Sequence, residues 1–133
     1  RTAIPARERA AFDAAARELE LRGLRGGEKP MTDFLLEFPD SALAGEAWRA
    51  LGEAFSAAGR HQDAARAHLA GFRDHGGLPG AAENLLGLAG ALAALGQLSE
   101  ACSAYLEFDV RFPDAPPSLR ARAREGAARA SCG

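Results

Sequence analysis

Apolar residues return every three or four positions along most of the chain. The stretch "GEAWRALGEAF" places Trp48, Leu51 and Phe55 on one side of a helix, and leucines between residues 85 and 92 repeat that spacing. A period close to 3.6 residues predicts amphipathic helices. The expected helices cover about residues 5–22, 42–58 and 62–74, a segment through 85–92, and then 99–112 and 116–131.

The same short phrase closes two of these apolar stretches. "EFPDSA" contains Pro39 and "RFPDA" contains Pro113, 74 residues later, while Gly59 and Gly96 lie 37 residues apart. Gly76 precedes Pro113 by 37 residues, so helix-breaking residues recur at 39, 76 and 113. A period of this length is typical of stacked supersecondary units. Each unit reads as helix, turn, helix and stop, with approximate bounds 5–40, 41–77 and 78–114.

Local signals predict how several of these helices begin and end. Gly59 is placed to end its helix in the left-handed conformation, and Ser99 is placed to cap the helix that it opens. Proline cannot continue a helix. After each proline, Asp40 or Ser41 and then Asp114 are suited to cap the next helix.

The first unit is less regular than the other two. Its segment "RGLRGGEKP" carries three glycines and a proline within nine residues. These residues usually interrupt helices. We therefore expect a loop there, followed by a short second helix over residues 30–38.

The composition narrows the fold class to all-α. Alanine, the best helix former, is abundant, while Val110 and Ile4 are the only β-branched aliphatic residues. A repeat array of this kind also needs a terminal helix whose outer face is polar. We expect the segment 116–131 to be that capping helix.

The second unit resembles a tetratricopeptide repeat. It carries Trp48, Leu51, Gly52, Phe55 and Ala64 at the spacings where those repeats hold tryptophan, leucine, glycine, tyrosine and alanine. The resemblance implies a right-handed superhelix of three such helical hairpins with a C-terminal capping helix. About seven helices would form a single domain spanning residues 1–133.

Charge and composition disfavour several classes of function. The formal net charge is −2 and the pI is about 5.9, which does not favour a nucleic-acid partner. The chain contains no run of 18 apolar residues, so the sequence predicts no membrane span. His61, His68 and His75 are seven residues apart, about 10 Å along a helix, which is too far for one metal ion. We expect these histidines to be solvent-exposed or partly packed.

Catalytic motifs are not found in the sequence. The paired acidic residues have no accompanying nucleophile or oxyanion donor, and the glycine runs lack the Lys–Ser/Thr ending of a phosphate loop. We therefore expect a protein without enzymatic activity, metal or cofactor.

The first helix of each unit should line the concave side of the stack, where a partner peptide can bind. Phe12 and Leu86 are either apolar anchors of this groove or members of the core, and Trp48 is expected to pack between the two helices of its unit. Arg49 and its acidic neighbours would supply charge complementarity. The predicted groove positions are Arg9, Phe12, Ala16, Leu19, Glu46, Arg49, Glu53, Ser56, Glu83, Leu86, Gly90 and Ala93.

A narrower resemblance extends over nearly the whole chain. The segments "AFDAAARELELRG", "EFPDSALAGEAWRALGEA", "LGLAGALAALGQLSEAC" and "RFPDAPPSLRARAREGAARASC" resemble the C-terminal repeat domain of the YbgF (CpoB) family. This family comprises the cell-division coordinators of the Tol-Pal envelope system. The pair Cys102 and Cys132 is similar to one in some members, which implies a disulfide.

The family resemblance implies a non-catalytic scaffold in the periplasm. The chain opens at Arg1 without a methionine, and we expect a longer protein with an upstream signal peptide and a coiled coil that makes it oligomeric. The implied partners are a TolA-like inner-membrane Tol component and a peptidoglycan synthase, which the scaffold would coordinate during cell division.

Several alternatives remain open from the sequence. The two cysteines are either a disulfide or two free thiols of a cytosolic protein. The alternatives to a division coordinator are an adaptor of another envelope assembly or motility system, and the targeting module of a larger envelope enzyme. The basic last helix is a solvated cap or a patch for acidic partners or membranes, through Arg120, Arg122, Arg124 and Arg129.

Overall fold

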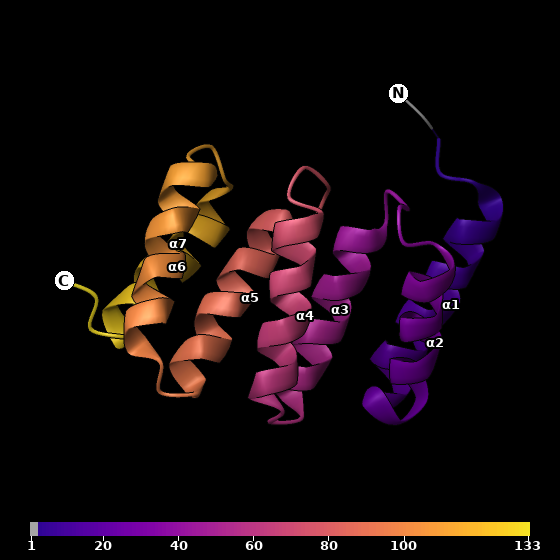
Figure 1. Ribbon diagram of the computed structural model, residues 1–133, viewed down its shortest axis with the longest axis horizontal. Coiled ribbons are helices and arrows are strands. Elements are labelled where there is room, and N and C mark those ends of the chain that lie inside the picture. The colour runs from indigo at the N-terminus through magenta and orange to yellow at the C-terminus, as the bar shows by residue number, and fades with distance from the viewer. Residues whose placement is uncertain (1–2) are drawn as a thin grey trace.

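Seven helices account for the secondary structure of residues 3–133, which the computed structural model describes, and those residues contain no strand (Figure 1). This confirms the all-α prediction. The helices are α1 (Ala6–Arg22), α2 (Leu24–Glu37), α3 (Ala44–Ala57), α4 (His61–Asp74), α5 (Ala81–Ala94), α6 (Leu98–Arg111) and α7 (Pro117–Arg129).

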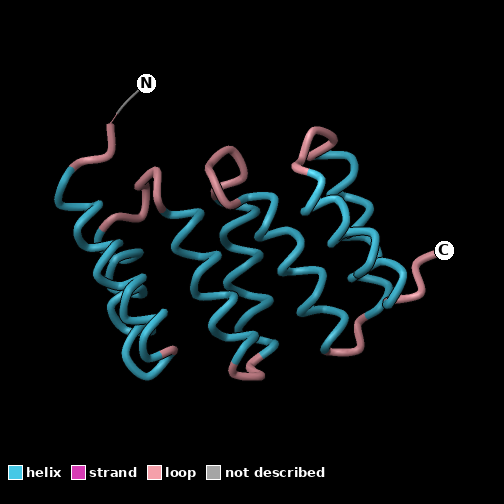
Figure 2. The backbone as a smooth tube through the Cα atoms, turned by 180° about the vertical axis from the view of Figure 1, so that it is seen from behind, coloured by secondary structure: helices cyan, strands magenta, loops and turns pink. Residues whose placement is uncertain are grey.

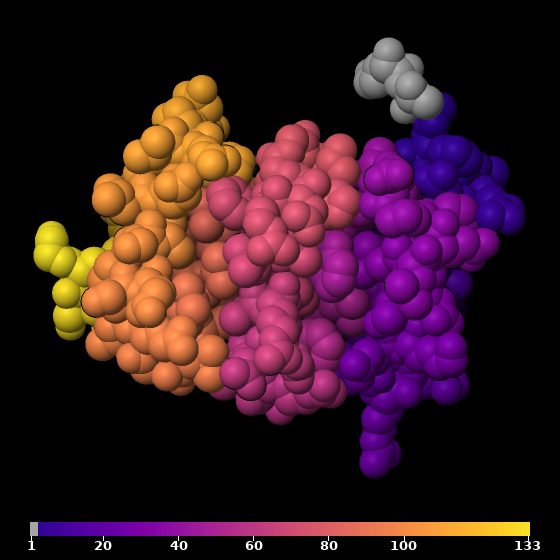
Figure 3. All heavy atoms as spheres, in the orientation of Figure 1, coloured from indigo at the N-terminus to yellow at the C-terminus, as the bar shows by residue number. Residues whose placement is uncertain are grey.

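The helices pair into three antiparallel hairpins of the tetratricopeptide type, α1–α2, α3–α4 and α5–α6, followed by the capping helix α7. The hairpins stand side by side in chain order, and both views show α1 and α7 at opposite ends of the row (Figures 1 and 2). Each hairpin covers its own band of the surface, in the order of the sequence (Figure 3). Such a stack buries its core between neighbours only.

The two sets of helices lie on different sides of the stack. The first helices, α1, α3 and α5, contact one another in series, and α5 also contacts α7. Among the described residues, the second helices α2, α4 and α6 do not approach one another. The row therefore fans open on the side of the second helices, and the first helices form the concave side.

The repeat period is visible in the helix bounds. Helices α2, α4 and α6 begin at residues 24, 61 and 98, 37 residues apart each time. Gly59 and Gly96, at φ angles of 76° and 80°, end α3 and α5 in the left-handed region. The amide after each glycine donates to the carbonyl five residues before it, Arg60 to Phe55 and Gln97 to Leu92, each at 2.9 Å. This pattern satisfies carbonyls that a helix end leaves unpaired.

The first hairpin corrects one prediction. The segment expected as a loop belongs to α2, which begins at Leu24 and includes Gly26, Gly27 and Pro30. A Cβ on Gly27 would lie 2.5 Å from the backbone nitrogen of Leu19, so this glycine permits a close crossing of α1 and α2. Pro30 removes one helical hydrogen bond, and packing against α1 outweighs that loss.

The predicted side-chain caps are not made. Helix α6 begins at Leu98, which places Ser99 inside the first turn, and no side-chain hydrogen bond caps it. Helices α3 and α7 also lack side-chain caps, so neither Asp40 nor Asp114 acts as one. The hydroxyl oxygen of Ser41 accepts from the Leu43 amide at 3.1 Å, just ahead of α3. Ser41 therefore stabilises the turn between hairpins and not the helix end itself.

Between the first two hairpins, volume is exchanged from one helix to the other. Trp48 on α3 lies opposite Gly71 on α4, where an added Cβ would be 2.8 Å from the Trp48 Cβ. At the same place in the first hairpin, 37 residues earlier, Ala11 is small and Phe34 is large and buried. A core is filled by total volume more than by any one residue. Trp48 thus packs between the helices of its own hairpin, as expected.

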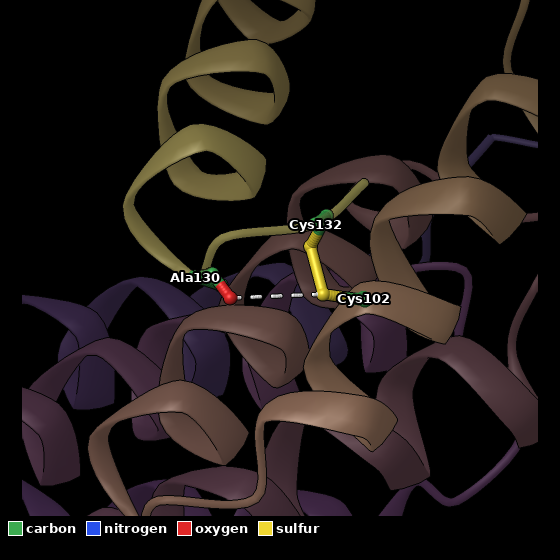
Figure 4. The surroundings of a disulfide bond; sticks show 3 residues. All are labelled: Cys102, Ala130 and Cys132. Atoms are coloured by element: carbon green, nitrogen blue, oxygen red, sulfur yellow. Dashed lines mark hydrogen bonds between the residues drawn. A yellow bond between two sulfur atoms is a disulfide. The ribbon is translucent and has the colours of Figure 1, made fainter.

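A disulfide fastens the end of the chain to the last hairpin. Cys102 on α6 and Cys132 after α7 are bonded, with their Cα atoms 5.5 Å apart (Figure 4). The Cys102 sulfur also lies 3.9 Å from the Ala130 carbonyl oxygen, a packing contact, since a disulfide sulfur carries no hydrogen. Among the seven described helices, none has the length and apolarity needed to cross a membrane.

Candidate functional site

The concave side carries two adjoining hollows. The larger, of about 880 Å³, lies between α1 and α3, and the smaller, of about 240 Å³, lies among α3, α5 and α7. Glu53 lines both, so the two hollows adjoin at this residue, and together they are called the concave groove. The wall of the larger hollow is made by Asp13, Ala16, Arg17, Leu19, Glu20, Leu21, Arg49, Ala50, Glu53 and Ala54.

Arg49 organises the charges at the middle of the groove. Its Nε donates to a Glu46 oxygen at 2.7 Å, and its Nη1 donates to the two Glu53 oxygens at 3.0 and 2.9 Å. Burial by itself lowers the pKa of Arg49, but the hydrogen bond to Glu46 and the charge of Glu53 outweigh it and raise the pKa. The three side chains therefore form a fixed charged cluster, in which one cation is held by two anions.

The smaller hollow has a histidine in its wall. His68 comes from α4, behind the concave helices, and is only 2% exposed. Its Nδ1 lies 2.9 Å from the side-chain oxygen of Asn84, and Asn84 donates to the Gly45 carbonyl oxygen at 3.0 Å. The network links α4, α5 and the start of α3.

Burial lowers the pKa of His68. The charges of Arg122 and Arg49 add to the lowering, whereas the hydrogen bond with Asn84 and the charge of Glu53 oppose it. Since the ordinary pKa of histidine is about 6.5, His68 is neutral at pH 7.

The structure brings most of the predicted groove residues to these hollows. Ala16, Leu19, Arg49 and Glu53 line the larger one. The smaller is lined by Glu53, Ser56, Glu83, Leu86 and Gly90. Glu46 takes part through its bond to Arg49.

Other predicted groove positions lie apart from the hollows. Phe12 packs edge-on against Phe34 with ring centroids 5.7 Å apart, and so belongs with the core. Arg9 pairs with Asp13 at 3.8 Å, and Ala93 lines neither hollow. Leu86, although it lines the smaller hollow, is only 4% exposed. Of the two open readings for Phe12 and Leu86, their burial favours core packing.

His68 and Arg122 line the smaller hollow but were not among the predicted groove positions. His68 was expected to be exposed or partly packed, which is wrong, because it is among the most buried side chains. The signal was the period: positions 37 residues to either side hold Met31 and Tyr105, both buried. A histidine in that register is a polar residue at a core position. No cluster of three or more metal-ligating side chains occurs in residues 3–133.

Comparisons with known proteins add no family assignment. No protein-family model matches the sequence, and no curated protein matches it significantly.

Proposed function

We propose that this chain is a non-catalytic protein-binding scaffold of the bacterial envelope, with a partner segment bound in the concave groove. The observation that carries the proposal is the pair of adjoining hollows along α1, α3 and α5. Neighbouring hairpins hold these helices from behind, so a segment can bind without disturbing the core. Apolar Leu19 beside the Arg49 cluster suits an amphipathic segment that offers both apolar and charged side chains.

The disulfide supports a periplasmic location. Disulfides persist in oxidising compartments such as the periplasm and are rare in the cytosol. Together with the resemblance to the Tol-Pal coordinators, this favours a TolA-like inner-membrane component and a peptidoglycan synthase as partners. The scaffold would then coordinate Tol-Pal function with peptidoglycan synthesis during division.

The groove assignment is tested by reversing one charge on each side of the stack. Arg49→Glu reverses the charge at the middle of the groove. Its matched control is Arg66→Glu on α4, where the arginine is 73% exposed and pairs with Asp63 at 3.5 Å in a similar i,i+3 contact. We expect about a tenfold or greater loss of affinity from Arg49→Glu and less than about a twofold change from Arg66→Glu.

The affinity of each variant is measured by isothermal titration calorimetry, with the periplasmic part of the Tol component and with the synthase. Circular dichroism checks that both variants keep the helical fold. Equal losses from the two variants would remove the groove as the binding surface. A wild-type chain that binds neither protein would overturn the partner assignment.

A further inference from the structure

His68 reaches the concave groove from the side of the second helices. It belongs to α4, a second helix, yet it lines the smaller concave hollow together with residues of α3, α5 and α7. The other residues of that hollow come from the first helices and the capping helix. A side chain that crosses the helical layer needs an opening between two backbones.

Two glycines make this opening. A Cβ on Gly52 of α3 would lie 2.5 Å from His68 Nε2, and a Cβ on Gly87 of α5 would overlap the same ring edge. Any other residue at either position would close the gap unless the imidazole moved. The Gly52–Gly87 window therefore lets the Nε2 edge of the ring pass between α3 and α5.

The hydrogen bonds fix which nitrogen carries the proton. Asn84 donates through its amide nitrogen to Gly45, so its oxygen faces His68 as an acceptor. Nδ1 of the neutral ring must therefore donate, and Nε2 keeps a free lone pair. Within residues 3–133, the His68 side chain makes only this one hydrogen bond, and no completely buried side-chain nitrogen or oxygen lacks a partner. Nε2 therefore has no partner and keeps a narrow contact with the hollow that His68 lines.

The surroundings of this nitrogen are rich in further acceptors. Glu53, Glu83 and the hydroxyl of Ser56 line the same hollow. Glu83 forms no salt bridge with any described residue, whereas Glu53 is shared with Arg49. Arg122 of α7 is the one cationic side chain among the described residues that line this hollow. Because Arg49 already holds Glu53, Glu83 is the carboxylate that remains for a further cation. Apolar Leu86 completes a lining that suits an alkyl stem with a charged end.

We propose that this hollow is a specificity pocket for a lysine or arginine side chain of the partner segment, whose nitrogen donates to His68 Nε2 and lies near Glu83. The inference rests on the proposed function in one respect, that the partner is a polypeptide bound in the groove. An anionic or purely apolar side chain fits less well, because it would leave both Nε2 and Glu83 without partners.

The pocket should release its ligand on acidification. Protonation of His68 removes the acceptor and adds a positive charge beside the bound cation. The charges of Glu53 and Arg49 of α3 and of Arg122 of α7 act on the ring, and Glu83 of α5 lines the same hollow. Since the pKa of His68 is lowered by burial, binding should stay constant around pH 7 and weaken only below about pH 6.5.

The test uses four small blocked amino acids as probes. N-acetyl amides of arginine and lysine carry the proposed charge, and those of citrulline and norleucine match their shapes without it. Each is titrated into the 15N-labelled 133-residue chain while the side-chain nitrogens of His68 are followed by NMR. We expect the arginine or lysine probe to shift the Nε2 resonance and to lower the apparent pKa of His68, and the neutral probes to do neither.

Two variants locate the effect. Glu83→Gln keeps the shape of the side chain and should lower the affinity for the charged probe by about threefold or more. Glu100→Gln, on the exposed start of α6, should leave that affinity unchanged. Equal shifts from arginine and citrulline, or equal effects of the two variants, would overturn the proposal. If the envelope partners fail to bind while the charged probes still shift His68, the proposed function fails and the pocket stands.

Discussion

The two junctions between successive hairpins differ in the polarity of the residues that pack there. At the first, between α2 and α3, the packed positions are apolar, and at the second, between α4 and α5, the same positions are polar or empty. The corresponding residues, 37 positions apart, are Met31 and His68, Phe34 and Gly71, and Ala47 and Asn84. All six are buried. The backbones differ as well, because α4 and α5 approach one another over a much longer stretch than α2 and α3 do.

This difference shows which features the fold itself requires. Both junctions need complementary volume, and Trp48 provides beside Gly71 the volume that Phe34 provides in the first hairpin. The first junction packs without a polar network, since Met31 and Ala47 stand where the second has His68 and Asn84. A buried polar pair is tolerated only when its hydrogen bonds are made. The His68–Asn84 pair meets that condition, and its explanation lies in the groove that His68 reaches.

The contact between α6 and the capping helix α7 extends the comparison, because it adds a covalent link. Replacing both Cys102 and Cys132 with alanine should lower the free energy of unfolding by roughly 3–4 kcal/mol on the chain-entropy model, for a separation of 30 residues. Urea denaturation of the double variant, compared with the oxidised wild type, measures the loss. A change below about 1 kcal/mol would mean that packing alone holds α7.

Gly71→Phe breaks the second junction by giving it the ring of the first. The added atoms would overlap Asn84 and the Trp48 Cβ, and we expect a loss of about 3 kcal/mol. Adding Trp48→Ala, His68→Met and Asn84→Ala to Gly71→Phe gives each position the residue found 37 positions earlier, and it should recover part of that loss. Urea denaturation midpoints of the single and quadruple variants provide the comparison. A quadruple variant less stable than the single one would contradict the exchange of volume between helices.

Asn84→Ala tests the polar network by removing one member. It leaves the His68 Nδ1 proton and the Gly45 carbonyl without their partner, and should cost about 1–3 kcal/mol. The double change His68→Met and Asn84→Ala converts the pair to its apolar counterparts and should be close to neutral. Thermal unfolding of both proteins gives the comparison. A double variant as unstable as the single one would show that the polar pair is required for folding.

The smallest expected effect is on the pH dependence of stability. The folded-state pKa of His68 lies below its unfolded value because of burial. On acidification below about pH 6.5, the unfolded chain binds a proton before the folded one does, so stability falls. Melting temperatures at pH 7.5 and 5.5 should therefore drop more for the wild type than for the His68→Met/Asn84→Ala variant. Equal drops would assign the acid sensitivity to other groups.

Much of the fold was readable from the spacing of residues. Gly59 and Gly96 marked two helix ends, and the 37-residue period located the three hairpins. The prediction went wrong where a local rule was preferred to the period. Local propensity predicts that Gly26, Gly27 and Pro30 break the helix, yet α2 contains all three and begins 37 residues before α4. Local propensity is a weak prior when a tertiary contact needs small residues.

The groove was predicted in outline and not in detail. Repeat geometry placed Arg49, Glu53 and Glu83 on the first helices, and they line the hollows. The same geometry assigned Phe12 to the groove, although its ring turns toward Phe34. A helical position specifies a face, while the direction of a side chain depends on the volume that its neighbours leave free.

The sequence by itself determined the helices, their order and their period, because these follow from short-range spacing and from residues that stop a helix. Only the tertiary structure decided what passes between the helices. Gly52 and Gly87 are 35 residues apart, and nothing local indicates that they face the same imidazole. A buried histidine can contact a backbone group, a carboxylate or an open hollow. Which of these it contacts depends on how three helices pack together, and the spacing of residues along one helix does not determine that.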